Sequence, residues 1–377
     1  MAHLTVYCVI LAITSVKPHQ IPHINNVFLQ PGYTSNSTTI SNQTFSQCLC
    51  ASSLSYPAVN WFPNGTCQVF YSFPPTYRIR SMTAARLYFP QKTYPNASLC
   101  CMPDINFLLN KLQSASMTLA NISNPRDMLI DDSGYLVTVE MSLNYLHRFS
   151  ATDLSSISRT AIPGYYQMAV AYDQGVFYST PNAGVLMHVI NSTTLAPVSN
   201  ITMALIKDPR GILFLDKSQT MMVTSNKNQT LLFFNRTSIV PPQYTYTYSQ
   251  VVNNLSPHGV WYVNDSYFYV TSYTQKLVFG YSKNTTAGQW NEALIVNASM
   301  LTTSGGSTSI VIDECGRLWV PQETNTIYIF DQQGVLLGNY TIPSLAVSFM
   351  KIVDNYIMYL SDCANNQIMR INPNIQC

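Results

Sequence analysis

The sequence predicts a mostly β protein, in which a small disulfide-rich α+β or β module precedes a ring of short antiparallel sheets. Two observations lead to this fold class. Six similar segments follow one another at intervals of roughly 35–50 residues, each rich in Val, Ile, Tyr and Phe between polar turns. Before them, five cysteines lie within residues 48–101, and 47% of the 377 residues are hydrophobic, which supplies a large core.

Each repeated segment is expected to form short strands joined by polar turns. The segments begin at Met128, Met168, Gly211, Gly259, Ser309 and Phe349. A four-stranded sheet of this size cannot bury both of its faces alone, so six of them are expected to pack around one axis. The pattern therefore predicts a six-bladed β-propeller over residues 105–377.

The sixth segment lacks a fourth strand, because the chain stops soon after its third. Residues Ser114 to Ala120, just before the first segment, have the composition of a detached strand. We expect this strand to complete the sixth sheet and close the ring, which removes an otherwise open sheet edge.

The N-terminal residues 1–16 are predicted to be a signal peptide. Leu4 to Val16 form an apolar run that suits a signal core and is short for a membrane span; a buried N-terminal strand is the alternative. No later stretch reaches membrane-spanning length without a break. We expect a secreted, extracellular protein with a module and linker at residues 17–104 and no membrane span.

Glycosylation sequons are more frequent than chance would give, which also favours secretion. The candidates are Asn36, Asn42, Asn64, Asn96, Asn121, Asn191, Asn200, Asn228, Asn235, Asn264, Asn284, Asn297 and Asn339. A further sequon at Asn254 is followed closely by Pro257, which weakens it.

Cysteine usage predicts disulfide bonds. Cys8 lies in the predicted signal peptide, and the disulfide candidates are Cys48, Cys50, Cys67, Cys100, Cys101, Cys315, Cys363 and Cys377. Five lie before the repeats and three within them, so at least one bridge joins the two regions if all are paired. Either Cys100 or Cys101 with Cys377 is the natural choice. Cys315 and Cys363 fall in turns at opposite ends of a propeller, which makes a bond between them geometrically poor.

Charge excludes one class of partner. Nineteen basic residues balance 17 acidic ones, and charged residues make up 10% of the chain, so there is no broad positive field for nucleic acid.

Two resemblances follow from particular motifs. The stretch Ile310 to Val320, with a strand, an Asp turn with Gly and a second strand, resembles the NHL-type six-bladed propellers. Cys48-Leu-Cys50 and the stretch Ala58 to Phe70 are similar to the core of PAN/apple-like modules. The first resemblance implies an architecture but no particular function. The second implies binding of proteins or glycans without catalysis.

The start of each first strand is the predicted ligand-binding position, because these starts open on the mouth of the propeller channel. Counting back from each turn gives Arg126, Gln167, Arg210 and His258 as the ligand-binding candidates, with Ser307 and Ser348 completing the ring. Pro before Arg126, Arg210 and His258 sets the angle at which each strand begins. Arg presents a planar fork that suits carboxylate, sulfate or phosphate. The structural alternative pairs Arg126 with Asp127 and Arg210 with Asp208.

We expect non-catalytic recognition of an extracellular protein or glycan, with no cofactor. One alternative is a propeller-type lactonase, esterase or lyase, with calcium or acid–base chemistry at the same mouth. Its candidate residues are Glu140, Asp208, His258, Glu323 and Asp362. Another is a structural matrix component. The sequence leaves open whether catalysis exists and what the oligomeric state is.

An alternating stretch with Tyr244, Tyr246 and Tyr248 has two interpretations. If all three rings share one face, they form a platform for sugar. We favour the other interpretation, an outer strand that packs against the next sheet.

Overall fold

The protein is described by a computed structural model, which divides the chain into two compact units, residues 1–103 with 375–377 and residues 104–374. The structure describes residues 23–31, 37–44, 47–48, 56–72, 77–88, 103–183, 185–203, 205–252, 256–284, 289–299, 301, 305–313, 315–343 and 345–375. The predicted signal peptide, Cys8, Cys50, Cys100, Cys101, Cys377, Asn36, Asn96 and Asn254 lie outside these residues.

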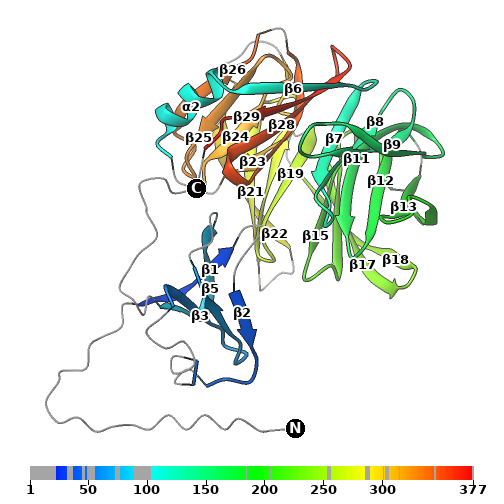
Figure 1. Cartoon of the computed structure of the whole chain (residues 1–377). Coiled ribbons are helices and arrows are strands. Elements are labelled where there is room, and N and C mark those ends of the chain that lie inside the picture. Colours follow the sequence, from blue (N-terminus) through cyan, green and yellow to red (C-terminus); the bar gives the residue numbers. More distant parts are fainter. Residues whose placement is uncertain are drawn as a thin grey trace, which may run out of the picture. The chain divides into compact units, whose positions relative to one another are not determined.

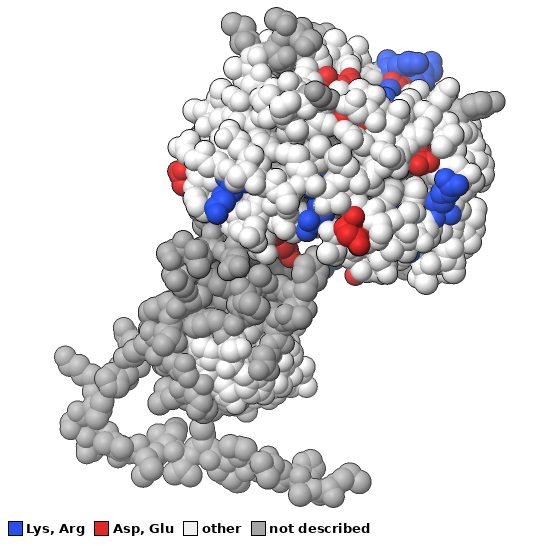
Figure 2. All heavy atoms as spheres, turned by 45° about the horizontal axis from the view of Figure 1, so that its top comes forward, with Lys and Arg blue, Asp and Glu red and all other residues white. Residues whose placement is uncertain are grey.

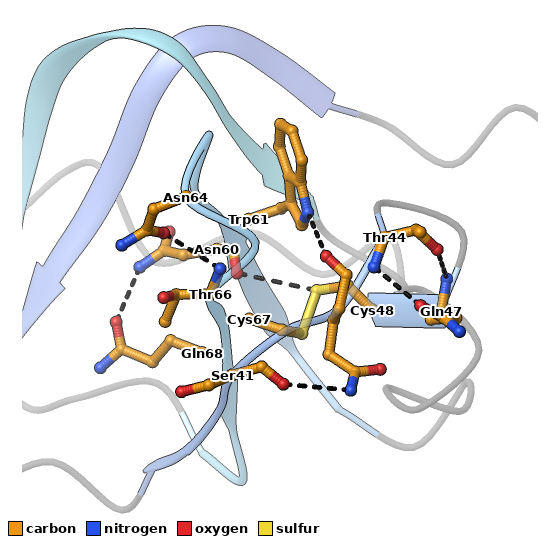
Figure 3. Close-up of a disulfide and its surroundings, with 11 residues drawn as sticks. Ser41, Thr44, Gln47, Cys48, Asn60, Trp61, Asn64, Thr66, Cys67 and Gln68 are labelled. Atoms are coloured by element: carbon orange, nitrogen blue, oxygen red, sulfur yellow. Dashed lines mark hydrogen bonds between the residues drawn. A yellow bond between two sulfur atoms is a disulfide. The ribbon is translucent and has the colours of Figure 1, made fainter.

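The N-terminal unit contains a five-stranded antiparallel sheet in the order β1-β5-β3-β4-β2. Its strands are β1 (His23–Pro31), β2 (Ser37–Ile40), β3 (Ala58–Trp61), β4 (Cys67–Phe70) and β5 (Tyr77–Tyr88). A disulfide joins Cys48 to Cys67 beside this sheet (Figure 3). The buried Asn60 side chain exchanges two hydrogen bonds with the backbone of Leu29, at 2.6 and 2.7 Å. The sheet and the Cys48–Cys67 disulfide confirm a small N-terminal β module with disulfide bonding.

The described residues of the second unit form six four-stranded antiparallel sheets (Figure 1). The first has β7 (Pro125–Ile130), β8 (Tyr135–Glu140), β9 (Tyr145–Ser150) and β10 (Ser156–Ala161). The second has β11 (Tyr165–Asp173), β12 (Val176–Ala183), β13 (Leu186–Asn191) and β14 (Pro197–Thr202). The third has β15 (Pro209–Leu215), β16 (Thr220–Ser225), β17 (Thr230–Ile239) and β18 (Pro242–Val251).

The remaining three sheets follow the same order along the chain, with one exception. The fourth has β19 (Pro257–Asn264), β20 (Tyr267–Ser272), β21 (Leu277–Lys283) and β22 (Trp290–Asn297). The fifth has β23 (Val311–Ile312), β24 (Leu318–Pro321), β25 (Thr326–Phe330) and β26 (Leu336–Thr341). The sixth has β27 (Val347–Val353), β28 (Ile357–Asp362), β29 (Gln367–Asn372) and β6 (Ser116–Asn121), with a short 3-10 helix η2 (Asp354–Tyr356) between β27 and β28.

The sixth sheet takes its outer strand from upstream in the sequence. Strand β6 pairs antiparallel with β29, in a register that joins Asn121 to Gln367 and Ser116 to Asn372. The predicted ring closure is therefore confirmed, although the strand begins two residues later than expected. Ser114 instead caps the end of a helix, α2 (Ile105–Gln113).

Sequence reasoning missed α2. The Asp104 side chain caps its first turn, accepting hydrogen bonds from the backbone N–H groups of Asn106 and Phe107. Leu108 and Leu112 are buried on one face of the helix, and the Leu112 carbonyl accepts a hydrogen bond of 3.1 Å from the Tyr340 hydroxyl on β26. The capping Asp and the apolar spacing of four were the available signals.

The hydrophobic cores of the second unit lie between neighbouring sheets. Tyr178 of the second sheet and Phe234 of the third belong to one core. Phe149 of the first sheet and Tyr359 of the sixth belong to another, so the closed ring is packed where its two ends meet. The predicted fold class, a mostly β protein with a six-bladed propeller, is confirmed. Within the described residues, no helix has the length and apolar character needed to cross a membrane.

The tyrosine-rich stretch forms β18, the outer strand of the third sheet. A register shift between the pairs Phe233↔Tyr248 and Phe234↔Tyr246 leaves one extra residue on β18. Tyr244 therefore packs into the core shared with the second sheet, while Tyr248 packs against the core shared with the fourth. The three rings share no common face, so the sugar-platform alternative is wrong and the outer-strand interpretation holds.

Candidate functional site

The first strands of the six sheets surround the central channel. Strands β23, β27, β7, β11, β15 and β19 lie next to one another in that order. We call the end at which these strands begin the mouth, and the opposite end, with the turns between first and second strands, the turn end. Figure 2 shows one face of the molecule, on which isolated charged groups are separated by uncharged surface.

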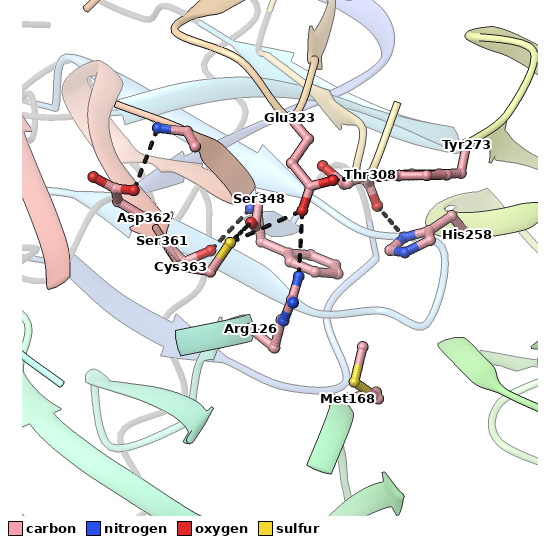
Figure 4. Close-up of polar contacts among 12 residues, drawn as sticks. Arg126, Met168, His258, Tyr273, Thr308, Glu323, Ser348, Ser361, Asp362 and Cys363 are labelled. Atoms are coloured by element: carbon pink, nitrogen blue, oxygen red, sulfur yellow. Dashed lines mark hydrogen bonds and ion pairs between the residues drawn. The ribbon is translucent and has the colours of Figure 1, made fainter. Parts of the chain in front are cut away.

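Arg126 lies at the mouth on β7 and reaches across to the fifth sheet. Its Nη1 atom lies 3.5 Å from Oε1 of Glu323 (Figure 4). Tyr273 follows β20, the second strand of the fourth sheet, and its hydroxyl donates a hydrogen bond to Oε2 of Glu323. The expected alternative of an Arg126–Asp127 pair is wrong, because Asp127 points its oxygens at the backbone N–H groups of Met128 and Val170.

Arg210 lies at the mouth on β15, where the expected contact with Asp208 is present. Its Nη2 atom lies 2.6 Å from Oδ1 of Asp208. The same guanidinium reaches the second sheet, where it contacts Asn182 Oδ1 and Met168 Sδ, each at 3.4 Å. Arg210 is therefore held more firmly than Arg126.

His258 is buried at the start of β19, with 4% of its surface exposed. Its Nδ1 atom donates a hydrogen bond of 2.7 Å to the Thr308 carbonyl, and the rings of Tyr273 and Phe349 lie within 6 Å of its own, at 5.5 and 5.7 Å. Burial first, and then the positive charges of Arg210 and Arg126, lower the pKa of His258 to about 3. His258 is therefore a neutral hydrogen-bond donor whose pKa is affected by the charges of both mouth arginines.

Gln167, the fourth ligand-binding candidate, turns into its own sheet. Its Oε1 accepts a hydrogen bond of 2.7 Å from Ser179 on β12, and the residue is fully buried. The two serines of the predicted ring behave alike: Ser307 accepts from Gln322 Nε2 at 2.8 Å, and Ser348 lies 2.8 Å from the Cys363 sulfur. The structure thus brings together Arg126, Arg210 and His258, and it gives Gln167 a contact within the second sheet.

Several mouth residues were not predicted as ligand-binding positions. Asn182, Tyr273, Glu323 and Cys363 all lie at the ends of second strands or just beyond them. Second strands run towards the mouth, so an alignment of the six repeats at the ends of their second strands would have identified these four residues as mouth residues. Glu323 was considered only for a calcium or acid–base site, and its partner Arg126 lies 197 residues away in sequence.

The five residues of the calcium alternative do not gather at one point. Glu140 lies 3.4 Å from His147, and Asp208 binds Arg210 and the side-chain amide of Asn226. Asp362 accepts hydrogen bonds from residues 346, 365 and 367, and so ties down the loop that follows it. Among the residues that the structure describes, no group of three or more His, Cys, Asp or Glu side chains is placed to hold a metal ion.

The two described cysteines of the propeller lie at opposite ends of it, as expected. Cys315 is in a first turn, and its sulfur lies 3.3 Å from the Tyr356 hydroxyl. Cys363 lies at the mouth, near Ser348 and 3.9 Å from Oε1 of Glu323.

Comparison with known proteins supports the fold. No family model matches the chain, and no curated protein matches it, so the NHL and PAN/apple resemblances stay predictions. Among solved structures, a luciferin-regenerating enzyme is similar with a TM-score of 0.52 and 13% identity, over 68% of this chain and 95% of that one.

Two further solved structures match over similar lengths. The WD40 β-propeller domain of Doa1 has a TM-score of 0.51 and 12% identity, over 66% of this chain and 78% of that one. The calcium-binding protein regucalcin from Agrobacterium tumefaciens has a TM-score of 0.51 and 11% identity, over 67% and 90%. Identities this low carry the fold alone, and the chain has the fold of the β-propeller proteins.

Proposed function

We propose that this protein is a secreted glycoprotein that binds an acidic group of an extracellular protein or glycan at the propeller mouth, without catalysis. Arg126 and Arg210 are the cations of this site. The observation that carries the proposal is the incomplete use of two guanidinium groups that meet at one end of the channel.

A guanidinium has five N–H donors, and the mouth leaves several of them without acceptors. Among the described residues, the buried Nε atoms of Arg126 and Arg210 have no hydrogen-bond partner. Each side chain keeps 16% of its surface exposed, so a ligand can reach it from the mouth. A carboxylate or sulfate supplies acceptors in the planar arrangement that arginine binds best.

The two arginines are expected to contribute differently. The 3.5 Å contact of Arg126 with Glu323 is long for a hydrogen bond, so an incoming anion exchanges with Glu323 at little cost. Arg210 keeps its 2.6 Å contact with Asp208 and adds positive potential from a fixed position. Arg126 is therefore the adjustable contact and Arg210 the fixed one.

Two observations support secretion and glycosylation. The Cys48–Cys67 disulfide is typical of an oxidising compartment. The eleven sequon asparagines within the described residues are all exposed or partly exposed, so each is accessible to a glycan. Expression in animal cells should place the protein in the medium, and peptide N-glycosidase treatment should lower its apparent mass; retention in the cytosol without a mass change would contradict this.

The binding test is an array of acidic and neutral glycans and extracellular domains, probed with the purified mature protein. Wild-type protein should capture acidic ligands, and the captured amount should fall as salt rises, because salt screens the arginine charges. Arg126→Gln and Arg210→Gln should each weaken capture by roughly tenfold, which corresponds to loss of about one charged hydrogen bond.

Lys283→Gln is the matched control. Lys283 is also a cation paired with a carboxylate, Asp216 at 3.0 Å, but it lies towards the turn end. Capture by this variant should equal that of the wild type. Capture of neutral ligands alone, or equal losses in all three variants, would contradict a binding site at the mouth.

A further inference from the structure

The central channel beneath the mouth contains a cavity of about 350 Å³. Residues of β7, β11, β15, β19 and β27 line it, together with Ser309 and Ile310. This volume falls within the range of small-molecule sites. The cavity is distinct from the exposed rim, although Arg210 borders both.

Two opposite charges line this cavity without forming an ion pair. Asp127 lies on β7, and Lys351 lies on the neighbouring strand β27. The Asp127 carboxylate accepts backbone N–H hydrogen bonds of 2.8 and 3.2 Å. The Lys351 amine lies 5.1 Å from the centre of the Trp261 ring, and within the described part of the chain no carboxylate lies within 4.0 Å of it.

Separated charges in a narrow channel are unfavourable, because each of these partly buried groups has lost some of its water without gaining a charged partner. Burial raises the pKa of Asp127 to about 6, and the charge of Lys351 offsets part of that rise. Burial likewise lowers the pKa of Lys351, and the charge of Asp127 opposes this. A ligand that carries both charges would replace the lost solvation at both ends.

We propose that the channel binds a small zwitterion, such as an α-amino acid with an apolar side chain. Lys351 receives its carboxylate, and Asp127 receives its ammonium group. The apolar part of the remaining wall, which includes Leu129, Ile212 and Phe349, suits an aliphatic or aromatic side chain.

The other titratable groups that line the cavity each contact a carboxylate. Arg210 is paired with Asp208 at 2.6 Å. The Tyr172 hydroxyl donates to Asp132 at 2.7 Å, and the Tyr262 hydroxyl donates to Asp265 at 3.0 Å. Lys351 and Asp127 are therefore the two charges whose pairing a ligand would complete.

The experiment compares three ligands that share the leucine side chain and differ in which charges they carry. L-leucine carries both charges, N-acetyl-L-leucine carries only the carboxylate, and L-leucinamide carries only the ammonium group. Equilibrium dialysis and thermal-shift measurements at pH 7 on the full mature protein should show that leucine binds at least about tenfold more tightly than either analogue. A panel of all the common amino acids replaces leucine if its side chain fits poorly.

Two variants should each remove the contribution of one ligand charge to binding. Lys351→Met should weaken binding of leucine and N-acetyl-leucine while leaving leucinamide unchanged. Asp127→Asn should weaken binding of leucine and leucinamide while leaving N-acetyl-leucine unchanged. General structural damage would weaken all three ligands together, and Lys283→Gln, which lies outside the cavity lining, should change none of them.

The comparison of the three ligands on the wild-type protein tests the zwitterion proposal by itself, even if a variant fails to fold. The proposal is overturned if no amino acid of the panel binds at about 10 mM. It is equally overturned if N-acetyl-leucine binds as tightly as leucine, or if both variants weaken all ligands alike.

Discussion

The mouth and the turn end of the propeller both carry arginines, but the contacts of these arginines differ between the two ends. At the turn end, Arg148, Arg236 and Arg317 each contact an aspartate near a first turn, at 2.8, 3.5 and 2.6 Å. Each also lies over an aromatic ring, with centroid distances of 5.1 to 5.7 Å. At the mouth, Arg126 contacts a carboxylate at 3.5 Å, and Arg210 contacts an aspartate, an amide and a thioether. Within the described residues, neither of them lies over an aromatic ring.

Arginines at both ends bond across sheets. The aromatic contacts separate the turn-end arginines, which we assign to holding sheets together, from the mouth arginines, which we propose are available to a ligand. Arg148 donates to the Ser192 carbonyl of the next sheet, and Arg236 crosses from the third sheet to Asp173 of the second. Stacking on a ring and bonding across two sheets uses both the face and the edge of the guanidinium. Within the described residues the mouth arginines lack the ring contact, whereas a buried Nε without a partner is common to Arg126, Arg210, Arg148 and Arg236.

The largest effect is expected at the turn end, from Asp313→Ala. The fully buried Asp313 carboxylate accepts hydrogen bonds from Arg317 Nε at 2.6 Å and from Trp319 Nε1 at 2.8 Å, besides two backbone N–H groups. Its removal leaves a buried cation without its carboxylate, so the free energy of unfolding should fall by about 3–5 kcal/mol. Urea unfolding at pH 7 measures this fall.

Asp331→Ala is the matched control in the same sheet. Asp331 accepts two backbone N–H groups in a turn of the same form, but it binds no cation in the described structure. Its loss should cost only about 1 kcal/mol. Equal losses for the two variants would show that the ion pair adds nothing at the turn end.

An intermediate effect on the free energy of unfolding is expected when the pH is lowered, because His258 at the mouth is buried in its neutral form. Burial, and then the charge of Arg210, lower its pKa to about 3, below the ordinary value of 6.5 that it regains on unfolding. Between these values the unfolded chain binds the proton and the folded protein does not, so stability falls as pH falls. This group alone should lower the free energy of unfolding by about 2 kcal/mol between pH 7 and pH 5.

The comparison of wild type with His258→Asn isolates this contribution, because the other titrating groups are common to both. Guanidinium unfolding curves at pH 7, 6 and 5 should show a smaller acid loss in the variant. Parallel pH profiles for these two proteins would disprove the buried, neutral state of His258.

The smallest effect on stability is expected from Arg126→Gln. The Arg126–Glu323 contact is 3.5 Å long and partly exposed, so its loss should change the free energy of unfolding by less than about 1 kcal/mol. Thermal and urea unfolding measure it. A loss as large as that of Asp313→Ala would move Arg126 into the class of arginines that hold sheets together.

Much of the architecture was predictable from the sequence, because the repeat determines it. The missing fourth strand of the sixth sheet pointed to an upstream replacement, and β6 fills that place beside β29. The Pro-Arg and Pro-His pairs at strand starts placed Arg126, Arg210 and His258 at one end. These inferences required only the order and spacing of strands.

Features that depend on a single inserted residue or on distant contacts were not predictable in this way. The register shift in β18 separates Tyr244 from Tyr248, although the sequence alternates perfectly there. Glu323 was identified as acidic, but the sequence does not show that Arg126 spans the mouth to meet it. The unpaired charges of Asp127 and Lys351 become visible only once their strands lie side by side.

The most direct test measures capture and stability together for Arg126→Gln and Arg317→Gln. The account predicts that Arg126→Gln loses most of its capture of acidic ligands and keeps its stability to within about 1 kcal/mol. It predicts that Arg317→Gln loses several times more stability, about 3 kcal/mol or more, and keeps its capture at a temperature where it remains folded. Loss of capture and stability in the same proportion in both variants would contradict the distinction between the two ends.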